Sequence, residues 1–83
     1  MATVELYDKG GNLIGRIPID NERCEELTSM TKDQLLFEVA GMVALAVRAE
    51  SGLELTLNQV LNELGKVVVC GREEVIDGGN PAV

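Results

Sequence analysis

The sequence contains no histidine and no tryptophan, and its aromatic residues are Tyr7 and Phe37 alone. Without histidine the chain lacks the commonest general base and the commonest metal ligand, and also the Ser–His and Cys–His pairs of nucleophilic catalysis. Carboxylates that stand together, such as Glu25 and Glu26, are sequence neighbours whose side chains point apart on a helix. We therefore expect a protein that is not an enzyme and that has no cofactor or metal site.

Basic residues are also scarce, since seven lysines and arginines accompany fourteen acids and the net charge is -7. Contact with nucleic-acid phosphates requires clustered positive charge, so direct nucleic-acid binding is not expected. A sharper hypothesis is that a row of carboxylates imitates phosphates and blocks the basic groove of a nucleic-acid-binding protein. Helix-dipole complementarity and solubility are the simpler explanation of these charges. The acidic residues concerned are Asp20, Glu22, Glu25 and Glu26.

The chain has two cysteines, Cys24 and Cys70, and no C-x-x-C motif. No basic-plus-apolar signal precedes Thr3, which leads directly into an alternating pattern. These observations favour a cytoplasmic protein with two reduced thiols over one with a single disulfide. The longest apolar run is shorter than the ~18 residues of a membrane span and contains Glu38, so no membrane insertion is expected.

The length of the chain, 83 residues, predicts one small domain over residues 1–76, followed by a loose tail over 77–83. Its core has to be built from aliphatic side chains, because aromatic residues make up only 2% of the sequence. A core of this size rarely supplies more than about 3–5 kcal/mol without a staple, a metal or a partner subunit. A partner subunit is one such source of stability.

The first part of the domain alternates apolar and polar residues on both sides of a glycine-rich turn, which predicts a β-hairpin. In its second strand, Leu13 and Ile17 are expected on one face and Ile14 on the other. Gly15 indicates a bulge in that strand. Pro18 cannot donate to a neighbouring strand, so the second strand is expected at an edge of the sheet.

Signals for helix starts follow the hairpin. Asp20 or Asn21 can cap a short helix that contains Leu27. A capping box over residues 31–34 then starts a long helix, which is predicted over residues 32–51 because a glycine follows at its end.

The same signals repeat once more. A second capping box over residues 56–59 starts a shorter helix that Gly65 is expected to stop. Residues 66–70, KVVVC, form a β-branched run that predicts a strand paired with the hairpin, and residues 72–76 can supply a fourth strand. The predicted fold is α+β in the order ββαααβ.

The predicted long helix is apolar around most of its circumference. A surface helix needs an apolar arc only a little over ~100° wide, and here the arc is about twice that width. One covering face therefore does not suffice. The stripe with most polarity contains, at spacings of three and four, Gln34, Glu38, Gly41, Leu45 and Arg48.

Two environments can satisfy such a helix. It can lie enclosed between the sheet and the short helices of one chain, or it can pack one face on its own sheet and offer the other to a second molecule. We favour the second, because the remaining chain is short. Gly41, between Ala40 and Ala44, makes a flat place for another backbone, either the protein's own hairpin or a partner, and Gly41→Leu is expected to disrupt folding or assembly. The candidate interface residues are Glu38, Gly41, Met42, Leu45 and Arg48.

These features predict a small acidic protein-interaction module that acts by occupying a surface of a protein partner. An inhibitor, an adaptor or a regulatory subunit fits this description, and self-association through helix 32–51, with a dimer favoured, is expected as well. Small acidic accessory proteins with which phages block host machinery share this size and charge, by analogy only. The alternatives are a purely structural homo-oligomer subunit and the phosphate mimic described above.

Overall fold

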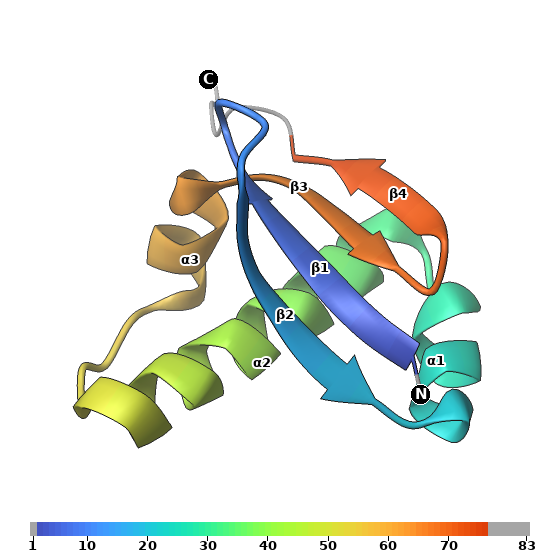
Figure 1. Ribbon diagram of the computed structural model, residues 1–83, viewed down its shortest axis with the longest axis horizontal. Coiled ribbons are helices and arrows are strands. Elements are labelled where there is room, and N and C mark those ends of the chain that lie inside the picture. Colours follow the sequence, from blue (N-terminus) through green and yellow to red (C-terminus); the bar gives the residue numbers. More distant parts are fainter. Residues whose placement is uncertain (1, 77–83) are drawn as a thin grey trace.

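The computed structural model describes residues 2–76 of the 83-residue chain. The elements follow the order ββαααββ (Figure 1). They are β1 (Ala2–Asp8), β2 (Leu13–Ile19), α1 (Asn21–Thr28), α2 (Lys32–Ser51), α3 (Leu57–Glu63), β3 (Leu64–Val69) and β4 (Arg72–Val75). The predicted α+β class is confirmed, and β4 is the fourth strand that the sequence allowed. The predicted tail over 77–83 lies outside the described residues.

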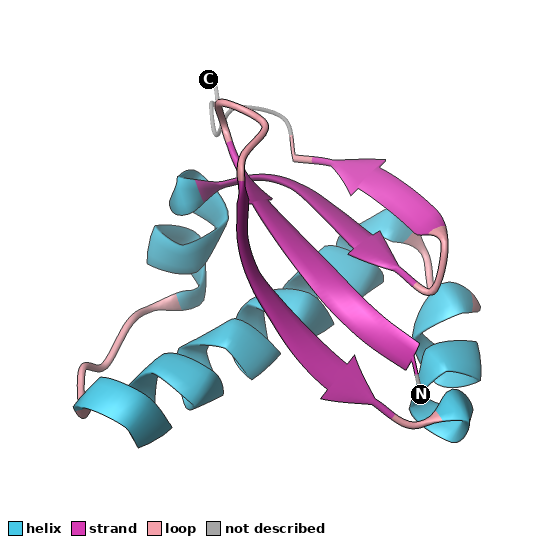
Figure 2. Ribbon diagram, in the orientation of Figure 1, coloured by secondary structure: helices cyan, strands magenta, loops and turns pink. Residues whose placement is uncertain are grey.

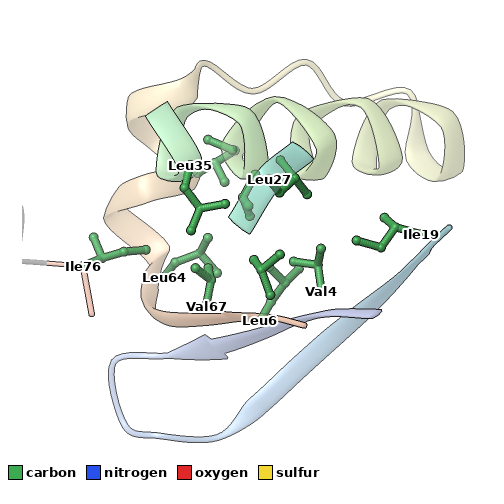
Figure 3. Packing of buried hydrophobic residues seen from close by; sticks show 12 residues of the cluster. Val4, Leu6, Ile19, Leu27, Leu35, Leu64, Val67 and Ile76 are labelled. Atoms are coloured by element: carbon green, nitrogen blue, oxygen red, sulfur yellow. The ribbon is translucent and has the colours of Figure 1, made fainter. Parts of the chain in front are cut away.

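The strands form one antiparallel sheet in the order β2-β1-β3-β4, so β3 pairs with the hairpin as predicted. Helix α2 crosses one face of this sheet diagonally, with α1 and α3 on either side of it (Figure 2). The core lies between the helices and that face of the sheet (Figure 3). It consists of Val4, Leu6, Ile19, Leu27, Leu35, Val39, Ala40, Val60, Leu64, Val67, Val69 and Ile76.

The turn between β1 and β2 is organised by Asp8. Its Oδ1 accepts hydrogen bonds from the N–H groups of Gly10 and Asn12, both at 2.9 Å. Gly11 has φ 85°, a left-handed conformation that glycine adopts without steric cost. The hydrogen bonds from Asn12 hold the pKa of the Asp8 carboxyl below its ordinary value, because they stabilise the ionised form.

The predicted bulge in the second strand is confirmed, and it changes which residues share a face. Leu6 opposes Gly15 whereas Tyr7 opposes Leu13, so Ile14 is the extra residue of β2. Leu13 therefore lies with Tyr7 on the open face of the sheet, and Ile14 lines a groove beside the helices. The predicted faces of Leu13 and Ile14 are wrong, because the extra residue reverses the alternation before Gly15.

The helix starts are as the sequence predicts. Asp20 caps α1, and the capping boxes of Thr31 and Thr56 begin α2 and α3. Helix α2 ends at Ser51, and Gly52 follows in the left-handed conformation with φ 74°. Within the described part of the chain, no helix combines the length and the hydropathy of a membrane span.

The end of α3 differs from the prediction. The helix stops at Glu63, and Leu64 already has extended backbone and begins β3. Gly65 is a strand residue, and a Cβ atom there would lie 2.5 Å from the carbonyl oxygen of Asp8. Glycine is needed at position 65 for this close approach and not as a helix stop.

Strand β3 ends at Val69, one residue before the end of the strand predicted over residues 66–70. Cys70 and Gly71 have φ 52° and 86° and form a two-residue turn, across which Val69 opposes Arg72. Two-residue hairpin turns with positive φ at both central positions match the twist of the flanking strands. Cysteine is not a usual residue of such turns, so the sequence did not reveal this one.

The predicted pair of reduced thiols is wrong, since Cys24 and Cys70 form a disulfide with a Cα–Cα distance of 6.1 Å. The bond joins α1 to the turn after β3, two segments 46 residues apart that the sequence alone did not place together. A second contact joins β4 to the segment between α1 and α2. The Arg72 Nη1 donates hydrogen bonds to the carbonyl oxygens of Thr28 at 3.2 Å and Met30 at 2.7 Å, where α1 leads into α2.

Candidate functional site

The two halves of α2 have different surroundings. In the N-terminal half, Leu35, Val39 and Ala40 are fully buried against the sheet. In the C-terminal half, the residues that continue this face, such as Val43 and Val47, are only partly buried. The last turns of α2 extend past β2, the edge strand of the sheet (Figure 1). The sheet therefore ends before the apolar face of the helix does.

A groove of about 590 Å³ occupies the space left beside this edge, between β2, the C-terminal half of α2 and α3. We call it the α2 groove. Most of its lining residues are apolar, and five are polar or charged. The apolar lining consists of Leu6, Ile14, Ile17, Val43, Ala46, Val47, Leu55, Val60 and Leu64. The polar residues that line it are Arg16, Glu50, Gln59, Asn62 and Glu63.

The charge at the α2 groove is acidic. Glu50 and Glu63 are exposed, and neither forms an ion pair within residues 2–76. The one basic residue of the lining, Arg16, has its Nε 3.6 Å from a carboxylate oxygen of Glu5. The arrangement can therefore bind an apolar segment that carries positive charge.

A second uncovered surface lies on the opposite side of α2, away from the sheet. Phe37 and Leu45 are 59% and 68% exposed and lie one helical turn to either side of Gly41. A Cβ atom at Gly41 would meet nothing within 4 Å, so the protein's own hairpin does not pack there. The expected contact of Gly41 with the protein's own hairpin is therefore wrong, and its contact with a second molecule stays a prediction. We call Phe37, Gly41 and Leu45 the outer stripe.

The other predicted interface residues have contacts within the chain. Glu38 accepts a hydrogen bond of 2.8 Å from Arg23 Nη2, which ties α1 to α2. Hydrogen bonds from Arg23 to Glu26 and Glu38 raise the pKa of the arginine, because they stabilise its charged form. Met42 is partly buried against the core, and the exposed Arg48 lies 3.9 Å from Glu54. The structure thus brings Gly41 and Leu45 together on an open face, whereas Glu38 forms a contact that joins α2 to α1.

The predicted acidic surface lies on and just before α1. The Asp20 side chain accepts a hydrogen bond of 2.7 Å from the N–H of Arg23 and caps the helix. Glu26 forms an ion pair with Arg23 one turn away. Glu22 and Glu25 are exposed. Two of the four carboxylates therefore have local structural partners.

The open face of the sheet carries polar contacts, both within β1 and between neighbouring strands. The Tyr7 hydroxyl donates a 3.0 Å hydrogen bond to Glu5, and this bond raises the pKa of Tyr7 above its ordinary value. The Lys66 ammonium lies 4.5 Å from the centre of the Tyr7 ring and 3.9 Å from Glu73. Side chains on this face therefore contact one another, in contrast to the unfilled α2 groove. Within residues 2–76, no cluster of three or more His, Cys, Asp or Glu could hold a metal ion.

Sequence reasoning identified the uncovered helix but missed the α2 groove. The groove depends on where β2 ends relative to α2 and on the position of α3, and both are tertiary features. Pro18 was the one useful signal, because it predicted a free edge at β2. Comparisons of the chain with protein-family models, with curated proteins and with solved structures find no match.

Proposed function

We propose that this protein is a non-catalytic interaction module that binds a partner protein through the C-terminal half of α2 and thereby inhibits, adapts or regulates that partner. The observation that carries the proposal is the α2 groove, an apolar hollow of about 590 Å³ at the point where the sheet ends. Contiguous apolar surface on a small protein usually marks an interaction site. This groove lies on the side of the helices, and the partner is therefore expected there.

Site-specific photocrosslinking in the source cells tests this proposal. A photoreactive amino acid replaces Glu50, which borders the α2 groove, or Glu22, which is also an exposed glutamate but lies on α1. We expect position 50 to crosslink to a partner protein and position 22 to give none. Crosslinks from position 22 alone would favour the acidic surface, and their absence from both positions would exclude a stable partner at either surface.

Self-association is a second proposal, and the outer stripe supports it. Gly41 offers open space between two exposed apolar side chains, where a second helix can approach closely. Light scattering is expected to show a dimer that Leu45→Glu or Gly41→Leu converts to a folded monomer. Val75→Glu is the control, because Val75 is also exposed, at 52%, but lies on β4. A monomeric wild-type protein would exclude both this proposal and the purely structural homo-oligomer.

The phosphate-mimic proposal has weaker support, because Asp20 and Glu26 already have partners in α1. It rests on the exposed Glu22 and Glu25, and reversal of both charges would abolish competition with nucleic acid if it were right. The cytoplasmic location stays a prediction. Its argument from reduced cysteines is lost, because disulfides persist mainly in oxidising compartments.

A further inference from the structure

The geometry points to an extended segment of a partner protein, apolar at alternate positions and basic, which adds to β2 as a fifth strand and fills the α2 groove with its side chains. This inference rests on the proposed interaction function and specifies the chemistry of the ligand.

The two edges of the sheet differ. Strand β4 is short, with four residues, and three of them, Arg72, Glu73 and Glu74, are charged. Short, charged edges are protected against pairing with another chain. Strand β2 has seven residues with Arg16 as its only charge, and Pro18 lies near its end. The bulge at Ile14 interrupts pairing at the other end, next to the α2 groove, so the regular segment between them, residues 15–17, is the part of this edge that an added strand can pair with.

The backbone groups at this free edge can be assigned from the pairing of β1. The carbonyl oxygen of Thr3 accepts a hydrogen bond from Cys70, so the polar backbone of Thr3 faces β3. Pro18 opposes Thr3, and its backbone therefore faces the free edge. The register is unbroken from Pro18 to Arg16, so Arg16 directs both its N–H and its C=O to the same edge. An incoming strand can hydrogen-bond to both groups of Arg16.

Such a strand would lie directly over the exposed part of the groove. Neighbouring strands are about 4.8 Å apart, and alternate side chains of the added strand point to the same side of the sheet as Ile17. On that side, the surface next to β2 is formed by Val43, Val47 and Leu55, which are only partly buried. Ile14, 54% exposed at the bulge, would contact the same side chains. Main-chain hydrogen bonds supply affinity in this mode of binding, and the groove supplies selectivity.

Charge decides between a partner and a second copy of this chain. Glu50 and Glu63 border the groove without an ion pair among the described residues. A second copy would bring a further net charge of -7 and the same two carboxylates toward this edge. A segment with lysine or arginine between its apolar residues would pair with them. The occupant is therefore a basic strand of a different protein.

A phage-displayed library of random ten-residue peptides tests the inference, with the disulfide-bonded protein as bait. Selected peptides are expected to alternate apolar with polar residues and to carry a net positive charge. Methylation of alternate backbone nitrogens on the edge that faces β2 should weaken binding about tenfold or more, since it removes hydrogen bonds to Arg16. Peptides without alternation, acidic peptides, tolerance of methylation or the absence of any binder would each overturn the inference.

Two adjacent residues give matched variants. Ile14→Glu places a carboxylate at the groove and should weaken the selected peptides about tenfold, because it puts charge against the apolar side chains of the added strand. Leu13→Glu, with 41% exposure on the opposite face, should change the affinity by less than about threefold. Equal effects of the two substitutions would contradict a strand above the groove.

Amide hydrogen exchange identifies the occupant. The Arg16 amide should exchange quickly in the free protein and slowly with peptide bound, whereas the Ile17 amide, which faces β1, stays protected in both states. Protection of Arg16 that rises with the concentration of the protein alone would show that a second copy occupies the edge. Crosslinking at position 50 without strand-like peptides would leave the interaction function standing and reject this inference.

Discussion

The two ends of α2 show how a small protein distributes its stabilising contacts. Both ends have standard helix terminators, the capping box of Thr31 and the left-handed Gly52, and apolar residues follow the same face throughout. At the N-terminal end the disulfide, the contacts of Arg72 and the Arg23–Glu38 ion pair join α1, α2 and the sheet. At the C-terminal end the corresponding contact is an exposed ion pair between Arg48 and Glu54, at 3.9 Å.

Under the proposed function, the two ends of α2 have separate roles. Contacts among α1, α2 and the sheet hold one end of the helix in place, and this leaves the other end free to present apolar surface without unfolding the domain. A binding surface makes fewer contacts within its own chain than a core does, because the partner supplies the remaining contacts. The following predictions test this division, beginning with the largest expected effect.

The same substitution at two positions of α2 compares a buried with an exposed leucine directly. Leu35→Ala should lower the free energy of unfolding by about 2–5 kcal/mol, since the side chain is fully buried and leaves a cavity. Leu45→Ala should change it by less than about 0.5 kcal/mol, because the side chain is 68% exposed. Urea unfolding at low protein concentration measures both. A large loss for Leu45→Ala would mean that the outer stripe is already covered in the free protein.

The disulfide should contribute the next largest effect. Replacement of Cys24 and Cys70 by serine is expected to lower the free energy of unfolding by about 2–4 kcal/mol, because the unfolded chain loses the closure of a long loop. Reductant should destabilise the wild-type protein and leave the double variant unchanged. Hydrogen exchange should accelerate most in α1 and at the β3–β4 turn. Alkylation of both cysteines without reductant would contradict the bond itself.

Two glycines should respond to alanine with opposite signs. Gly65→Ala is expected to destabilise the fold by about 1–3 kcal/mol, because a Cβ would lie 2.5 Å from backbone oxygen of Asp8. In the monomer, Gly41→Ala should stabilise the fold by up to about 1 kcal/mol, since the added methyl meets open space in a helix. Thermal unfolding of the two variants at a protein concentration that keeps the chain monomeric checks this. Destabilisation of the dimer alone by Gly41→Ala would support the proposed close packing at the outer stripe.

Local sequence signals predicted the elements of this fold well. Each capped helix start, the hairpin and the left-handed Gly52 depend on residues within a few positions of one another, so the chain reports them directly. Leu13 and Ile14 show where local reasoning ends. Alternation assigned their faces, but a bulge of one residue reversed them.

The features missed from the sequence depend on distant segments. Cys24 and Cys70 meet because α1 packs beside the end of β3, and the α2 groove exists because the sheet stops at β2. Neither follows from the spacing of residues along the chain. The excess apolar arc of α2 was visible in the sequence, and it indicated an uncovered surface without showing that β2 and α3 would shape it into a groove.

The smallest expected effect distinguishes local from tertiary stabilisation. Thr31→Ala and Thr56→Ala each remove a capping box, whose N–H···Oγ1 distances are 3.3 Å and 3.1 Å, one at the well-packed end of α2 and one beside the groove. Because a cap acts within the first turn of its own helix, each substitution should lower the free energy of unfolding by about 1 kcal/mol, despite the different surroundings of the two sites. Urea unfolding measures the cost, and Thr→Ser at each site is the control that keeps the hydroxyl. A cost confined to Thr31 would show that α3 contributes little to the stability of the free protein.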